Sequence, residues 1–378
     1  MDRKIMVLAA LFPPQKKGGG PTVSIMNLLN TIKGSVTIYV ISHNHEVGEQ
    51  APLPGIEEKE YERDFGKVFY FNHGNDSYKN LYMKLEDFAP DTIYVNSFFS
   101  WNYTLSALVY SKKHRNVKVI IAPRGELCTN AYGLKKFKKS AYVAFCQMSG
   151  LMGGVCWHAT AEEEKVDIRK IMKVDEKSIN VIPNISIIPQ RIFDTVEKHS
   201  GDLKLVFVSR IQVKKNLLFT LKLLRGQKCS VSLDIYGPLE DKEYWNECEK
   251  IIDKLPENIR VQYCGILRQS QIHTTLKKYH AFVLTTLSEN YGHAIVEALL
   301  SYRPVIISDQ TPWTDVNEAH AGFAGNLSEP EKFCETLTRL VEMDQEEFNN
   351  LCMRAGDYID QKIDNKKIEE SYRSMFWR

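Results

Sequence analysis

The fold is decided by the segment at residues 203–224, which reads LKLVFVSRIQVKKNLLFTLKLL. Residues 203–210 form an apolar, β-branched run and predict a buried strand. The pattern at 216–224 has helical spacing, so the segment predicts a strand, a short basic loop and a helix. This succession is the building unit of a parallel sheet covered by helices.

The same unit recurs along the chain on both sides of this segment. Similar runs C-terminal to it predict strands at 230–237, 259–265, 281–288 and 303–309. Runs N-terminal to it predict strands at 4–12, 36–42, 92–98, 117–123, 156–161 and 179–184. Amphipathic segments separate the strands, for example at 21–33 and 294–302. The sequence therefore predicts an α/β protein made of two doubly wound, Rossmann-like halves.

The length of 378 residues exceeds what one ordinary core holds, so two domains are expected. Proline and mixed charge interrupt the rhythm at 187–202, which we interpret as a linker between domains at 1–186 and 203–358. An amphipathic helix is expected at 359–378. Open parallel sheets bind ligands beyond the carboxyl ends of their strands, so we expect the site in a central cleft between the two domains.

Composition excludes several classes of protein. The chain is 43% hydrophobic and 25% charged with a net charge of +2, which is ordinary for a globular protein and does not indicate nucleic-acid binding. No apolar run approaches the roughly 18 residues of a membrane span, and the run before Pro13-Pro14 suits a first strand better than a signal peptide. Eight cysteines without a C-x-x-C pair argue against zinc and indicate a reduced, cytoplasmic location.

A glycine run, Gly18-Gly19-Gly20, follows the first predicted strand and precedes a helix expected to open at Pro21. Glycines let backbone amides approach a ligand closely, and a helix N-terminus favours an anion such as phosphate. A flexible turn without a ligand explains the glycines equally well. The dinucleotide and P-loop motifs are both absent.

Arg210 and Lys215 lie in the loop after the strand at 203–210. Two cations at this spacing could grip one diphosphate, the arginine through a fork of donors and the lysine as a point charge. Taken alone, an arginine at a strand end is more often a surface residue.

The segment SENYGHAIVE at 288–297 places one glutamate in a loop and a second in the following helix. Glu297 lies among apolar neighbours, where a carboxylate is costly unless it is paired or hydrogen-bonded, and a ribose diol would satisfy it. The amides of Asn290, Tyr291 and Gly292, at the helix start, could hold sugar hydroxyls or a phosphate. A structural ion pair is the alternative for a helix glutamate.

Taken together, these motifs resemble the retaining GT-B glycosyltransferases of glycosyltransferase family 4. The family's E-x7-E signature is matched at Glu289 and Glu297, and its R-x4-K element at Arg210 and Lys215. APRGEL at 122–127 is similar to the family's S-P-R-G-M-L motif, and HATAE at 158–162 and VIPN at 181–184 stand where the family has related segments. The resemblance spans nearly the whole chain.

The resemblance implies a role for each matched donor-side residue. Arg210 and Lys215 would hold the diphosphate and stabilise the leaving group, and Glu289 would contact the donor sugar. Glu297 would bind the ribose, and Gly18 to Gly20 would close against the phosphates. It also implies that neither a metal ion nor any other cofactor is needed, and that the C-terminal helix crosses back to the first domain.

On the acceptor side the resemblance points to Arg124, Gly125 and Glu126 and to the loop after the strand at 92–98. Many relatives carry a histidine or aspartate in that loop, whereas residues 93–101 contain no such group here. Asn96 or Ser97 could orient a hydroxyl there, but neither is a base at neutral pH. Glu126 replaces an apolar residue of the family, and both acceptor recognition and a drifted surface position remain open for it.

The expected function is retaining transfer of a hexose or N-acetylhexosamine from a nucleotide-diphosphate sugar, UDP-linked by default, to a glycan or lipid-linked saccharide, as in surface polysaccharide synthesis. The alternatives are a catalytically degenerate protein that binds sugar nucleotide or glycan, and a nucleotide-sugar epimerase. Lysines interleaved with aromatic residues suggest contact with the inner face of the plasma membrane, although a solvated helix face explains them too. These lysines are Lys135, Lys136, Lys138 and Lys139.

Overall fold

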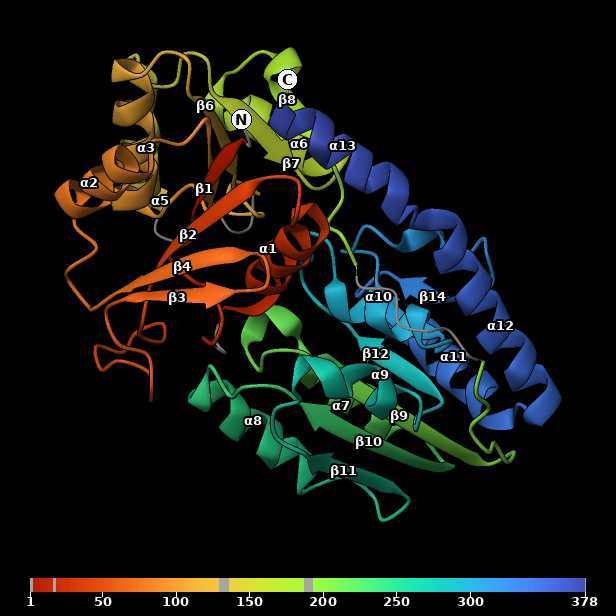
Figure 1. Cartoon of the computed structure of the whole chain (residues 1–378). Helices are drawn as coiled ribbons and strands as arrows, with labels where there is room; N and C mark the ends of the chain where they lie inside the picture. Colours follow the sequence, from red (N-terminus) through yellow and green to blue (C-terminus); the bar gives the residue numbers. More distant parts are fainter. Residues whose placement is uncertain (1–2, 16–17, 129–135, 187–192, 378) are drawn as a thin grey trace. The chain divides into compact units, whose positions relative to one another are not determined.

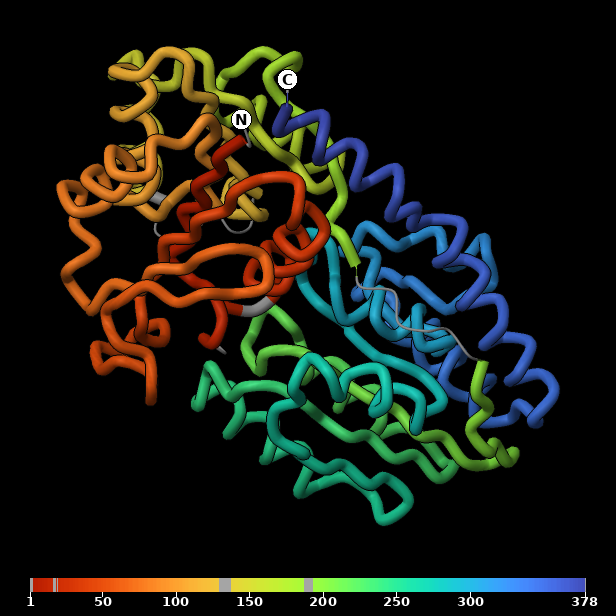
Figure 2. The backbone as a smooth tube through the Cα atoms, in the orientation of Figure 1, coloured from red at the N-terminus to blue at the C-terminus, as the bar shows by residue number. Residues whose placement is uncertain are grey.

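The computed structural model describes residues 3–15, 18–128, 136–186 and 193–377 (Figures 1 and 2). The chain divides into two compact units: residues 1–185 together with 365–378, and residues 186–364. We call them unit 1 and unit 2 and describe each by itself.

Unit 1 is a sheet with the strand order β3-β4-β2-β1-β5-β6-β7-β8, parallel except where β3 pairs antiparallel with β4. Its strands are β1 Lys4–Leu8, β2 Thr37–His43, β3 Glu60–Arg63, β4 Gly66–Phe71, β5 Thr92–Asn96, β6 Lys118–Ala122, β7 Cys156–Ala159 and β8 Ile179–Val181. Its helices are α1 Gly19–Ile32, α2 Tyr78–Phe88, α3 Trp101–Lys113, α5 Lys136–Met148, α6 Glu162–Met172 and α13 Asn365–Trp377.

The central strands of unit 1 are apolar throughout because helices cover both faces of the sheet. Residues of α2, α3, α5 and α6 share one buried cluster with alternate residues of the strands. Helix α1 packs with α13, whose Phe376 ring lies 5.6 Å from that of Tyr94 in β5. Arg3 Nη1 donates to the Trp377 carbonyl (2.8 Å), so the C-terminal helix is bonded to the start of unit 1.

Unit 2 is a parallel sheet with the order β11-β10-β9-β12-β13-β14. Its strands are β9 Asp202–Val208, β10 Ser230–Tyr236, β11 Ile259–Tyr263, β12 Ala281–Leu284, β13 Val305–Ser308 and β14 Gly322–Gly325. Its α-helices are α7 Leu217–Arg225, α8 Lys242–Ile252, α9 Ile272–Leu276, α10 His293–Leu300, α11 Pro330–Glu342 and α12 Gln345–Lys362. Short 3₁₀ turns include η2 Val213–Lys215 and η3 Gln269–Gln271.

The predicted α/β architecture of two Rossmann-like, doubly wound sheets is confirmed. Several predicted strands are too long at their carboxyl ends. The strand expected at 281–288 ends at Leu284, where the hydroxyls of Thr285 and Thr286 donate to carbonyls of the loop after β9. Within the predicted linker, Lys198 is buried in unit 2 and its ammonium donates to the Val341 and Met343 carbonyls.

Candidate active site

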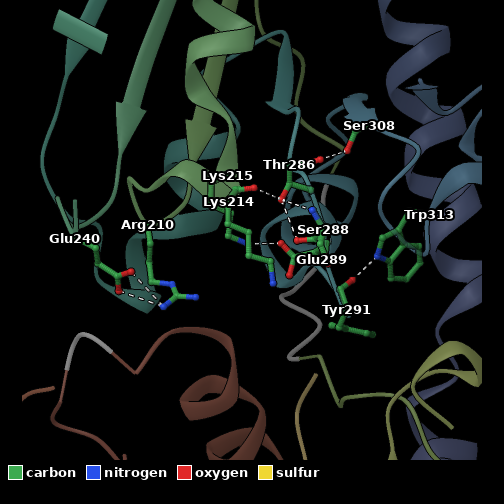
Figure 3. Close-up of polar contacts among 10 residues, drawn as sticks. All are labelled: Arg210, Lys214, Lys215, Glu240, Thr286, Ser288, Glu289, Tyr291, Ser308 and Trp313. Atoms are coloured by element: carbon green, nitrogen blue, oxygen red, sulfur yellow. Dashed lines mark hydrogen bonds and ion pairs between the residues drawn. The ribbon is translucent and has the colours of Figure 1, made fainter. Parts of the chain in front are cut away.

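Two loops at the carboxyl edge of the unit 2 sheet are tied together (Figure 3). One follows β9 and the other follows β12, and these strands are hydrogen-bonded neighbours. The Lys214 carbonyl accepts from Thr286 Oγ1 (3.0 Å) and from the Leu287 amide (2.8 Å). The loops that carry the predicted catalytic residues therefore form one connected surface.

Lys215 and Glu289 form an ion pair across these two loops (Figure 3). Their side chains are only 10% and 17% exposed. Burial alone would raise the pKa of Glu289, but the Lys215 ammonium, with Lys214 and His293 nearby, lowers it below its ordinary value. The pair is thus charged, and Glu289 fixes where the lysine ammonium lies.

Arg210 lies in the loop after β9, and Glu240 of the loop after β10 accepts from it at 3.2 Å. The arginine side chain is 37% exposed, so this contact is weak and exchangeable with another anion. Sequence reasoning missed Glu240. Its position beyond the end of the strand next to β9 was the available signal, because parallel strand ends share one edge.

Glu297 lies in α10, with its carboxylate accepting from Gln269 Nε2 of η3 at 2.7 Å. Burial raises the pKa of this carboxyl to about 7, although the Gln269 hydrogen bond lowers it. Gln269 was not predicted as a site residue. One amide donor leaves the carboxylate with further capacity to accept, as binding of a diol requires.

The segment before α10 is shaped by Gly292, which caps the helix with φ +77°. A Cβ there would meet Ile295 Cδ1 at 2.8 Å. Tyr291 is buried: its hydroxyl lies 3.0 Å from Ser186 Oγ, and Trp313 Nε1 donates to its carbonyl. Its ring is therefore engaged within unit 2. Asn290 lies between Tyr291 and the paired Glu289.

In unit 1, α1 begins at Gly19 with Gly18 as its N-cap, earlier than the start expected at Pro21. Gly18 and Gly20 lie at the edge of the first turn, which contains no acidic residue. A Cβ on Gly18 would lie 1.8 Å from Thr22 Oγ1, so this position requires glycine unless that side chain moves. The glycines thus form a bare helix N-terminus near the end of β1.

Glu126 organises the loop that follows β5. Its carboxylate accepts from Ser97 Oγ (2.7 Å) and from the amides of Phe98 (2.7 Å) and Phe99 (3.1 Å). Ser97 has φ +111°, an unusual value for a residue with a side chain. These contacts exclude the interpretation of Glu126 as a drifted surface position. Burial raises the pKa of this carboxyl, while Ser97 and the two amides lower it.

Arg124 is bonded in three directions within unit 1. Its Nε donates to Asn96 Oδ1 (2.8 Å), Nη1 to Asn184 Oδ1 (2.6 Å) and Nη2 to the Tyr94 hydroxyl (2.7 Å). The Tyr94 hydroxyl in turn lies 2.7 Å from Nδ1 of the fully buried His158. The segments 122–127, 158–162 and 181–184 therefore meet at one edge of this sheet.

Gly125 follows with φ +79°, and its amide donates to Glu164 Oε1 at 2.5 Å. Glu164, which is fully buried, also accepts from the Thr160 amide (2.8 Å) and hydroxyl (2.7 Å). Sequence reasoning did not single out Glu164, although HATAE at 158–162 ends only two residues before it. The backbone of the predicted acceptor motif is thus held by buried polar groups.

A second group missed from the sequence begins at His43, the last residue of β2. The rings of His43 and His45 stack at 3.9 Å, and His73 Nδ1 lies 3.4 Å from His45 Nε2. Gln15 Nε2 lies 3.0 Å from His43 Nδ1. Burial lowers the pKa of His43 to about 4, so its ring is neutral at pH 7. Within the described residues no group of three or more His, Cys, Asp or Glu side chains is arranged to hold a metal ion.

The predicted lysine cluster falls on helix α5. Lys138 is exposed, and Lys139 lies 4.8 Å from the centre of the Phe99 ring. Lys136 begins the helix, and Lys135 lies outside the described residues. Among the helices of the described part of the chain, none has the length and apolarity of a membrane span.

Comparison with known proteins matches residues 190–361 to the family described as Glycosyl transferases group 1. The chain is 24% identical over 234 residues to the phosphatidylinositol N-acetylglucosaminyltransferase gpi3 subunit of Schizosaccharomyces pombe. That match covers 61% of the chain and 46% of the relative, so the chain spans about half the length of the curated relative it matches.

Solved structures match over nearly the full length. Anabaena HepE in complex with UDP and glucose has a TM-score of 0.73 at 14% identity, covering 99% of each chain. A Staphylococcus aureus TarM mutant in complex with UDP and glycans has a TM-score of 0.73 at 13% identity, again covering 99% of each. The chain has the GT-B fold. The segment 190–361, which matches the glycosyl transferases group 1 model, includes Arg210, Lys215, Glu289 and Glu297.

Proposed function

We propose that the chain is a retaining glycosyltransferase that moves a hexose or N-acetylhexosamine from a UDP-sugar to a glycan or lipid-linked saccharide, without a metal ion or other cofactor. The observation that carries the proposal is the charged Lys215–Glu289 pair at the carboxyl edge of unit 2. It lies within the segment that matches the glycosyl transferases group 1 model. A fixed ammonium at a sheet edge is suited to a diphosphate leaving group.

In the proposed reaction, the bond between the anomeric carbon and the diphosphate oxygen breaks, and an acceptor oxygen attacks on the same face. The acceptor proton passes to the departing phosphate oxygen. Lys215 and Arg210 stabilise the charge on the leaving group, and Arg210 exchanges Glu240 for phosphate. Glu297 accepts hydrogen bonds from the ribose diol, Glu289 and the 290–292 backbone contact the donor sugar, and Gly18 to Gly20 approach the phosphates.

The neighbours support uridine as the base, since HepE and TarM are solved with UDP. The name of the fission-yeast relative supports an N-acetylhexosamine donor and a lipid-borne acceptor. We place Asn96, Ser97 and the backbone of Arg124, Gly125 and Glu126 on the acceptor side, with activity at the inner face of the plasma membrane in surface polysaccharide synthesis.

The test is UDP-sugar turnover by the purified full chain in EDTA, with the Lys215→Ala variant as the altered site and Lys222→Ala, an exposed lysine on α7, as the matched control. We expect UDP-sugars to raise the melting temperature of the wild type and of Lys222→Ala but not of Lys215→Ala. We also expect slow metal-independent release of UDP with retained sugar configuration. Inverted product or a strict metal requirement would refute the mechanism.

A second candidate is a degenerate protein that binds nucleotide sugar without transferring it. The lack of a histidine or aspartate at 93–101 favours it. The same experiment separates the two functions. A melting shift without hydrolysis or transfer to any acceptor pool would support the binding protein.

A further inference from the structure

Helix α5 carries apolar side chains on its outer face as well as on its buried face. Tyr142, Val143 and Cys146 point into the core of unit 1. The outward positions, at spacings of three, four and seven residues, are Phe137, Ala141, Ala144, Phe145 and Met148. Phe137 is 94% exposed and Met148 is 87% exposed. A surface helix normally places polar residues outward, so this face indicates a binding surface.

Trp101 at the start of α3 extends this surface. It is 48% exposed, and its ring stacks against Phe145, itself 44% exposed, with centres 5.9 Å apart and planes at 20°. We call Trp101 and the five outward residues of α5 the aromatic face. In Figure 1, α3 and α5 lie side by side within unit 1.

The aromatic face adjoins the acceptor-side loop. Trp101 directly follows residues 97–100, where the amides of Phe98 and Phe99 donate to Glu126. Lys139 of α5 lies over the Phe99 ring of the same loop. A surface that docks on the aromatic face therefore lies next to the loop we place on the acceptor side.

The charge around α5 indicates an anionic occupant. No aspartate or glutamate occurs between Glu126 and Glu162, whereas four lysines stand at 135, 136, 138 and 139. Lys138 is exposed on α5 beside Phe137. Aromatic rings combined with lysines and no carboxylates match the interface of an anionic bilayer, where rings lie at headgroup depth and ammonium groups meet phosphates.

We propose that the aromatic face docks unit 1 on an anionic lipid bilayer. This inference rests on surface composition, exposure and charge, and does not require the proposed transfer reaction. If both hold, a lipid-linked acceptor reaches the loop at 97–100 directly from the membrane surface.

The experiment is co-sedimentation of the full chain with vesicles of phosphatidylcholine alone or mixed with phosphatidylglycerol. We expect binding to the mixed vesicles only, weakened by added salt. Replacing both protruding residues, Phe137→Ser with Met148→Ser, is expected to lower partitioning by at least about tenfold. Lys138→Glu is expected to lower it at least about fivefold.

Matched controls use exposed residues on other helices of unit 1. Met83→Ser with Val166→Ser removes side chains that are 53% and 62% exposed on α2 and α6, and Lys170→Glu changes an exposed charge on α6. These variants should bind vesicles like the wild type. Because every substituted side chain is exposed, all variants should have the melting temperature of the wild type. This measurement checks that each variant is folded.

Three outcomes overturn the proposal. One is equal partitioning of the wild type and the Phe137→Ser, Met148→Ser variant. Another is no binding of the wild type to mixed vesicles. The last is dimerisation of the wild type without lipid, abolished in that variant and unaccompanied by vesicle binding, which would make the aromatic face an interface between copies. UDP-sugar turnover in solution is measured alongside, so failure of membrane docking and failure of the proposed transfer remain distinguishable.

Discussion

The carboxyl edges of the two sheets use charge in different ways. In unit 2, Lys215 and Glu289 pair across loops, while Arg210 holds Glu240 through a partly exposed contact. In unit 1, by contrast, Arg124 directs its three guanidinium nitrogens at groups of the same unit. One edge presents charges that a ligand can recruit, whereas the other uses charge to tie the side chains of its own segments together. Under the proposed function, we therefore expect unit 2 to bind the diphosphate by charge and unit 1 to select the acceptor by shape.

The largest effect should come from the Lys215→Met variant. Loss of this ammonium removes the fixed charge facing the proposed leaving group, and we expect kcat/KM to fall by about a thousandfold. It also leaves Glu289 buried without its partner, at a cost of about 3 kcal/mol in unfolding free energy. The double variant with Glu289→Gln should recover stability but not activity. Recovery of both would show that the pair is only structural.

A change at Arg124 should affect stability in unit 1 without affecting nucleotide binding. Arg124→Lys cannot reach all three acceptors, and we expect a loss of about 3 kcal/mol in unfolding free energy. UDP affinity of the folded protein should stay within about twofold, because the three hydrogen-bond partners of Arg124 all belong to unit 1. Thermal unfolding and calorimetric titration with UDP measure the two quantities. A parallel loss of UDP affinity would contradict the division of roles between the units.

Glu126 should affect the acceptor rather than the donor. Glu126→Gln places an amide NH2 group, which cannot accept, opposite donors that now meet a carboxylate. The 97–100 loop therefore loses hydrogen bonds, at a cost of about 2 kcal/mol in unfolding free energy. We expect the acceptor KM to rise about tenfold with the donor KM unchanged, since displaced positioning groups weaken orientation. Steady-state kinetics with each substrate varied in turn gives the acceptor KM and the donor KM separately. An equal change in both KM values would argue for a general folding defect.

Glu297 gives a pH signature to unit 2. Burial raises the pKa of its carboxyl from the ordinary 4.5 to about 7, so the folded state holds this proton more tightly than the unfolded state. Its contribution to stability is therefore complete below the unfolded value and is lost as pH rises through about 7. In the proposed binding mode the ribose diol donates to the Glu297 carboxylate, so UDP-glucose affinity should rise over the upper part of the same window. The UDP-glucose affinity of the Glu297→Gln variant should not change with pH over this window. If its affinity varies with pH as steeply as that of the wild type, Glu297 is not the cause.

Much of the fold follows from the sequence because buried parallel strands are continuous apolar runs. β3 and β14 were not predicted for the opposite reason, whereas β4 was missed although its VFYF is an apolar run. EYER in β3 is an edge strand carrying charge, and GFAG in β14 is half glycine, so neither shows an apolar run. Their strand character comes from pairing with neighbours distant in sequence, which a local pattern does not report.

The candidate site was predictable in its cations and carboxylates but not in their partners. Arg210, Lys215, Glu289 and Glu297 stand in motifs, whereas Glu240 of a loop and Gln269 of a 3₁₀ turn stand in none. The role of Glu126 was also hidden, because its three donors come from residues nearly thirty positions earlier. Pairings of this kind depend on strand order, and that order appears only in the folded sheet.

The smallest expected effect is also the most direct test of exchangeable charge in unit 2. Glu240→Gln removes the carboxylate that accepts from Arg210 at 3.2 Å and frees the guanidinium for phosphate. A partly exposed pair contributes about 0–1 kcal/mol, so stability should barely change, while UDP affinity should rise by about twofold to threefold. Calorimetric titration with UDP at low and high salt measures the affinity. The gain in UDP affinity should shrink as salt is added, because the contact is exposed. If affinity falls instead, Glu240 positions Arg210 as Glu289 positions Lys215, and both cations of this edge are fixed before the donor arrives.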